Sequence, residues 1–173
     1  MIRRAAVVVS VALTTLAFPV LAQELTGTLK KVKDSGSITM GIRESSLPLS
    51  YLDDKQQPVG YHIEICNRII DAVKANLKMA ELKVTHTPVT SQNRIPLVTN
   101  GTVDLECGST TNNEARKKQV DFAPTTFVTN VRMAVKKSSG ITSLGQLGGK
   151  PVATTTGTTS VQLMRAHEKG KGI

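Results

Sequence analysis

A repeated order of segments between Ser37 and Gln119 restricts the fold of this chain more than any other feature. Short apolar segments are each followed by a polar stretch and then by a segment with helical periodicity. The apolar, strand-like segments cover residues 37–42, 82–89 and 103–107, and the helical segments cover residues 63–77, 94–99 and 114–119. Strands that alternate with helices form a mainly parallel sheet with helices on its faces. The sequence therefore predicts an α/β fold.

Polar side chains follow each predicted strand. Arg43 comes directly after the first strand, and the runs TSQNR and GSTTNN each precede or contain a helix start and each lead to an arginine, Arg94 and Arg116. Ligands of open α/β sheets sit beyond the carboxyl ends of the strands. Arginines, hydroxyls and free backbone N–H groups are what a small anion needs. Ordinary caps and turns use the same residue types, but two such runs with an arginine each favour one anion site.

The remaining segments are predicted from shorter patterns. Ser91 is a plausible N-cap of the helix at 94–99, and the loop Thr155–Ser160 opens a further helix with its hydroxyls and Gly157 at the positive helix end. We also expect helices at residues 28–34 and 161–167 and a helical turn at 143–147. A strand is expected at 130–137, a short strand at 151–154 and a turn at 51–59.

The first 22 residues have the pattern of a cleaved secretory signal peptide. A short positive region is followed by an uncharged apolar run, 5–21, and Val20-Leu21-Ala22 offers small residues at the right offsets. A retained membrane anchor is the alternative, because a run of this length is near the lower limit for a membrane span. We expect cleavage and a periplasmic location.

The charge pattern argues against nucleic acid as a partner. The formal net charge is +9, but the lysines and arginines are dispersed and aromatic residues make up 3% of the chain. Binding of bases needs clustered positive charge and stacking platforms. We therefore expect the basic residues to form a solvated surface.

Two cysteines, Cys66 and Cys107, remain after the predicted signal. An even number of cysteines in an exported protein makes a disulfide the default. Spacing alone does not distinguish this bond from two buried free thiols. The sequence has no C-x-x-C and its three histidines are scattered, so it predicts neither a redox motif nor a metal site, and we expect no cofactor.

Three longer stretches carry a resemblance to a known family: GIRESSLPLSY, VTSQNRIPLVTNGTVDLECGSTTNNEAR and GKPVATTTGTTS. They closely resemble the polar amino-acid branch of the periplasmic solute-binding proteins of ABC importers, and within it the glutamate/aspartate-binding members. The resemblance covers residues 27–165. It implies a periplasmic-binding-protein-like fold of two α/β lobes that close on a ligand, with residues 23–130 as a nearly complete lobe one. Residues 131–173 would begin a truncated lobe two.

The resemblance also implies roles for seven residues. Arg43, Ser91 and Arg94 would surround the side-chain carboxylate of glutamate or aspartate. Ser109 and Thr111 would receive the α-amino and α-carboxylate groups, Arg116 would be the main carboxylate clamp, and Thr159 would add a hydroxyl or N–H from lobe two. The family's aspartate for the α-ammonium group would lie beyond Ile173.

The expected function is therefore capture of L-glutamate or L-aspartate by a non-enzymatic monomer that delivers it to a membrane permease. The alternative is a periplasmic enzyme on the same fold, such as a dehydratase that acts on a carboxylic acid. Such an enzyme needs a positioned acid or base. Glu44 and Glu106 are the nearby carboxylates, and neither has an evident partner in the sequence. The preference between glutamate and aspartate, the folding of the chain and the identity of the permease stay open at this point.

Overall fold

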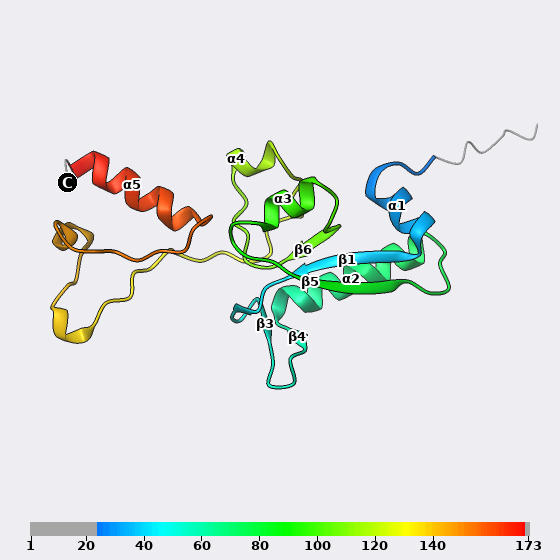
Figure 1. Ribbon diagram of the computed structural model, residues 1–173, viewed down its shortest axis with the longest axis horizontal. Helices are drawn as coiled ribbons and strands as arrows, with labels where there is room; N and C mark the ends of the chain where they lie inside the picture. Colours follow the sequence, from blue (N-terminus) through cyan, green and yellow to red (C-terminus); the bar gives the residue numbers. More distant parts are fainter. Residues whose placement is uncertain (1–23, 172–173) are drawn as a thin grey trace, which may run out of the picture.

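The computed structural model describes residues 24–171, so the predicted signal peptide lies outside the described residues. Its main sheet has three parallel strands (Figure 1). Strand β1 (Ser37–Ile42) lies in the middle, with β5 (Lys83–Pro88) on one side and β6 (Leu105–Cys107) on the other. The predicted α/β fold is confirmed. All three strands therefore end at the same edge of the sheet.

The core forms between this sheet and the helices that pack against it. The alternation in β1 buries Ile38, Met40 and Ile42 on one face. Helix α1 (Gly27–Ser35) contributes Val32, and α2 (Tyr61–Asn76) contributes its apolar face. Burial of these side chains is the main favourable term for the fold, at roughly 1.5–3 kcal/mol for a fully buried aliphatic side chain.

The predicted turn at 51–59 is in part a small antiparallel sheet. Strands β2 (Ser45–Ser46), β3 (Ser50–Leu52) and β4 (Pro58–Val59) pair in this order. Within residues 51–59, the turn is confined to the segment between β3 and β4. Strands of two or three residues are too short to show a period of two. The sequence pattern therefore indicated only the turn.

Two short helices follow the outer strands of the main sheet. Helix α3 (Arg94–Thr99) comes after β5, and α4 (Glu114–Lys117) comes after β6. The prediction of Ser91 as the N-cap of α3 is wrong. Thr90 and Asn93 instead bond each other reciprocally, each backbone N–H donating to the other side chain at 2.7 and 3.1 Å. Asn93 has the N-cap position.

The predicted strands at 130–137 and 151–154 are wrong. Residues 121–136 and 148–155 have no regular structure, and two 3-10 helices, η1 (Lys137–Ser139) and η2 (Leu144–Leu147), lie between them. A strand persists only when a neighbouring strand takes its backbone hydrogen bonds. No described segment pairs with these residues, and Val131 is 56% exposed.

Helix α5 (Thr159–Lys171) ends the described chain, and it begins two residues before the predicted helix. Figure 1 shows it at the opposite end of the molecule from α1. No helix within residues 24–171 is both long enough and apolar enough to cross a bilayer.

Candidate functional site

Arg43 meets the loop after β6 at the carboxyl edge of the sheet. Its Nη1 donates to Ser109 Oγ at 3.4 Å, and Ser109 Oγ in turn lies 3.5 Å from Ser46 Oγ. Ser50, which is completely buried, fixes the backbone of Arg43: its hydroxyl accepts from Arg43 N at 2.9 Å and lies 3.4 Å from Arg43 O. The end of β1 and the end of β6 are therefore joined through an arginine and two hydroxyls.

Arg94 is the most deeply buried of the predicted site residues. Its side chain extends from the first turn of α3, and the residue is 3% exposed. Burial lowers the pKa of Arg94 to about 10; the carboxylate of Glu106 opposes this shift, and Arg116 and Arg43 add to it. The guanidinium remains charged at neutral pH. Because the charges of Arg116 and Arg43 lower the pKa of Arg94, the three arginines form one positively charged cluster.

Arg116 joins the loop after β6 to the segment before α5. Asn113 caps α4 by accepting from Arg116 N at 3.0 Å. The guanidinium then donates from Nη1 to Thr111 O at 2.9 Å and from Nη2 to Gly157 O at 3.1 Å. Burial lowers the pKa of Arg116, and Glu106 opposes the shift.

The loop of Gly157 also lies against Ser91. Gly157 has a φ of +77°, and a Cβ at this position would lie 2.5 Å from Ser91 O. Only glycine combines this backbone conformation with such a close approach. Thr159, two residues further on, is half-buried at the first position of α5. The structure thus brings the loop before Thr159 against Ser91 and Arg116.

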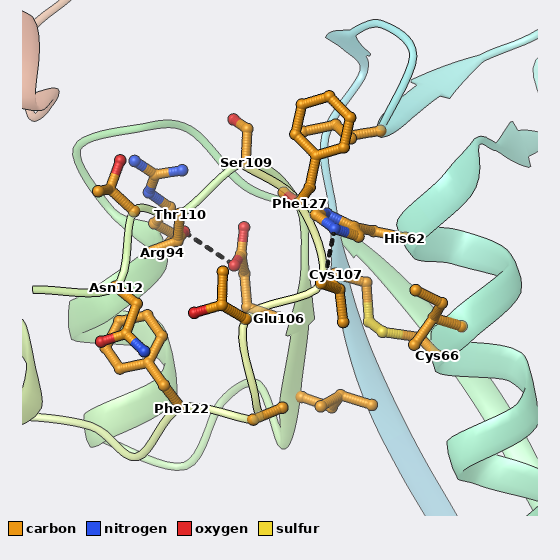
Figure 2. Close-up of a pocket in the computed structure, with 18 of the residues that line it drawn as sticks. His62, Cys66, Arg94, Glu106, Cys107, Ser109, Thr110, Asn112, Phe122 and Phe127 are labelled. Atoms are coloured by element: carbon orange, nitrogen blue, oxygen red, sulfur yellow. Dashed lines mark hydrogen bonds between the residues drawn. A yellow bond between two sulfur atoms is a disulfide. The ribbon is translucent and has the colours of Figure 1, made fainter. Parts of the chain in front are cut away.

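A cavity of about 510 Å³ opens beside β6 (Figure 2). Of the seven predicted site residues, Arg94, Ser109 and Thr111 line it. Its other lining is largely apolar and comes mainly from α2, α3, β6 and the segment 120–129, including Ile65, Phe122 and Phe127. The polar end of this cavity is the part that can receive an anion.

Two further polar side chains reach this cavity. His62, in the first turn of α2, contacts Gly108 O through Nδ1 and Thr126 Oγ1 through Nε2 at 2.9 Å. Glu106 accepts from the Thr110 hydroxyl at 2.8 Å. The sequence pointed to Glu106 only as a nearby carboxylate, and no pattern in the sequence singled out His62.

The predicted disulfide between Cys66 and Cys107 is present. It joins α2 to the last residue of β6, immediately before the loop that carries Ser109. Both cysteines are buried, with 6% and 1% exposed. The bond therefore fixes the base of the site to the core.

The cluster can hold an anionic group with charge-assisted hydrogen bonds. Within residues 24–171 it combines three arginines with the hydroxyl of Ser109, and Glu106 is the carboxylate that acts on all three. Guanidinium groups bind carboxylates in a planar, two-pronged geometry. In the same range, no group of three His, Cys, Asp or Glu side chains is placed to hold a metal ion.

The structure thus places an arginine cluster at the carboxyl edge of an α/β sheet. Residues 38–170 match the family of bacterial extracellular solute-binding proteins, family 3. The chain belongs to this family.

Two curated relatives and one solved structure show how close the similarity is. The L-glutamate/L-aspartate-binding protein of Pseudomonas aeruginosa is 52% identical over 90% of this chain and 52% of its own length. The glutamate/aspartate import solute-binding protein of Escherichia coli is 48% identical over 83% of this chain and 48% of its own length. An ancestral arginine-binding protein bound to arginine has a TM-score of 0.60 and 27% identity, covering 80% of this chain and 58% of that one. The chain thus spans about half the length of these curated relatives.

Proposed function

We propose that this protein is the solute-binding component of an amino-acid ABC importer and that its ligand is L-glutamate or L-aspartate. The observation that carries the proposal is the convergence of Arg43, Arg94 and Arg116 at the carboxyl edge of one sheet. Two curated relatives whose names specify glutamate and aspartate support the ligand class.

The charge of the cluster suits a dicarboxylic amino acid. Such a ligand brings two carboxylates, and the arginines lie at three separate positions, after β1, on α3 and on α4. In this proposal Arg43, Ser91 and Arg94 receive the side-chain carboxylate. Ser109, Thr111, Arg116 and Thr159 receive the α-amino and α-carboxylate groups.

The proposal includes an organisation in two lobes, with residues 23–130 in the first lobe and residues 131–173 at the start of the second. Arg116 and Ser91 already contact the loop of Gly157 across this boundary. A ligand that binds groups on both sides favours the closed arrangement, because it stabilises that state selectively.

Export through a cleaved signal peptide and handover to a membrane permease complete the proposed function. The family description, bacterial extracellular solute-binding proteins, and the disulfide support a location outside the cytoplasm. We propose that the chain acts as a monomer. We also propose that it is not an enzyme, as the names of both curated relatives support.

Isothermal titration calorimetry tests the ligand. L-glutamate, L-aspartate and L-glutamine are titrated into the purified chain at neutral pH. We expect binding of at least one acidic amino acid and weaker binding of glutamine, because its amide leaves charged donors poorly paired. The cost is roughly 1–3 kcal/mol, or about fivefold to 150-fold in affinity. No heat with any of the three amino acids contradicts the proposal.

A matched pair of variants assigns the binding to the cluster. Arg94→Gln removes a buried charge of the site, whereas Arg68→Gln removes an exposed charge on α2. We expect loss of acidic ligand binding in the first variant and unchanged affinity in the second. Equal affinity in both variants places the ligand elsewhere.

A further inference from the structure

The neighbours of Glu106 pair only one of its two carboxylate oxygens within the described residues. It is the middle residue of β6, and its Oε2 accepts from the Thr110 hydroxyl at 2.8 Å. Within the described residues, Oε1 is buried without a hydrogen-bond partner. The backbone of Gly108 passes so close that a side chain there would collide with Oε1. In Figure 2 the carboxylate points into the space between Arg94 and Ser109.

The guanidinium of Arg94 also has nitrogens without hydrogen-bond partners within the described residues. Its Nε and Nη1 are also buried, and neither has a partner among the described residues. The ion pairs found within residues 24–171 at up to 4.0 Å include neither Arg94 nor Glu106. A buried positive group and a buried negative group therefore share one cavity without direct contact, and each acts on the other through a medium that screens charge poorly.

Basic side chains from several elements interact with Glu106. Arg94 comes from α3, Arg43 from the end of β1, His62 from α2 and Arg116 from α4. Burial raises the pKa of Glu106, while the Thr110 hydrogen bond and then the charges of Arg94, Arg43 and His62 oppose this rise. The arginine charges thus offset part of the cost of burying the ionised form.

We propose that Glu106 is a positioning residue that serves as the internal counter-charge of the arginine cluster, and that an acidic ligand takes over this role as Glu106 picks up a proton. The inference rests on the proposed function of the site. The proton comes from solvent and adds to Oε1, the oxygen without a partner, while Oε2 keeps the Thr110 hydrogen bond. The ligand carboxylate then compensates Arg94.

The proposal fixes the sign of a pH dependence. A ligand carboxylate near Glu106 disfavours the ionised form, so the pKa of Glu106 is higher in the complex than in the empty site. Between these two pKa values the complex binds more protons than the free protein. The affinity therefore increases as the pH falls, by at most about tenfold per pH unit for one proton.

Carbon-13 NMR of glutamate side-chain carboxyl groups tests the counter-charge role without ligand. Glu106→Gln identifies the resonance. We expect a titration midpoint above the ordinary value for glutamate, and a further rise in Arg94→Gln, which removes a favourable charge. The control Arg68→Gln should leave the midpoint unchanged. An ordinary midpoint that Arg94→Gln does not move overturns the inference, whether or not any amino acid binds.

Calorimetry of L-glutamate binding in buffers of different ionisation heat tests the exchange of roles. We expect the wild-type chain to take up a fraction of one proton on binding and Glu106→Gln to take up less. Equal uptake in both, or a wild-type midpoint that ligand does not raise, contradicts the exchange. If Glu106→Gln does not fold, the shift of the wild-type midpoint with ligand still decides. A raised, Arg94-sensitive midpoint without binding of any amino acid supports the counter-charge role and refutes the proposed function.

Discussion

Reduction of the disulfide between Cys66 and Cys107 should lower the free energy of unfolding by about 4 kcal/mol. The two cysteines are 41 residues apart in sequence. In the chain-entropy model, closing a loop of this length removes roughly 13 cal/mol/K from the unfolded ensemble, which is about 4 kcal/mol at 25 °C. Small domains have total stabilities of about 5–15 kcal/mol. The bond therefore accounts for a large share of the stability.

Urea unfolding followed by far-ultraviolet circular dichroism, with and without a thiol reductant, measures this contribution. Reduction keeps both sulfur atoms in place, so it isolates the effect of the cross-link. The double variant Cys66→Ala/Cys107→Ala is the control, because the reductant should not change its stability. We expect this variant to be less stable than the reduced wild-type chain, since alanine also leaves space in the core.

A loss below about 1 kcal/mol on reduction would refute the reasoning. Such a result means that the unfolded chain already holds the two segments close together, or that the native packing of α2 against β6 improves when the bond is absent. The slope of the free energy of unfolding against urea distinguishes these cases for the reduced chain. Residual structure in the unfolded state lowers this slope.

Two substitutions test how the backbone supports the cluster. Ser50→Ala removes the hydroxyl that bonds both backbone groups of Arg43. We expect a loss of about 1–3 kcal/mol in urea unfolding, because a partly buried N–H loses its acceptor. Ser45→Ala, at an exposed site, should cost little. Gly108→Ala places a Cβ 2.8 Å from Arg43 Cγ. We expect calorimetry to show at least tenfold weaker binding of the acidic ligand with the fold retained, and unchanged affinity would argue that the loop adjusts freely.

The predictability of the site differs from residue to residue. Arg43, Ser109 and Arg116 follow strand ends in the sequence, and the structure gives them bonds to one another's loops. Their roles toward a ligand stay predictions. Glu106 was harder to interpret, because a carboxylate in a strand has no local partner. It interacts with Thr110 in the loop after β6 and with basic side chains from α3, α2 and the end of β1.

The amino-acid sequence by itself determined the order of the central elements. The alternation in 37–42 and the apolar face of α2 are local patterns, and both elements form where the patterns place them. The segment 130–137 has a similar local pattern and forms no strand. Local periodicity selects which face of an element is buried, but a strand also needs a neighbour to bond with, and that neighbour is a property of the whole fold.

Only the tertiary structure decided how the charges are combined. The parallel order β5-β1-β6 brings the ends of three strands to one edge, and residues as far apart as Arg43 and Ser109 meet there. The burial of Arg94 opposite Glu106 follows from how α3 packs beside β6. Electrostatic coupling depends on distance and on the exclusion of water, and neither quantity is a function of spacing along the chain.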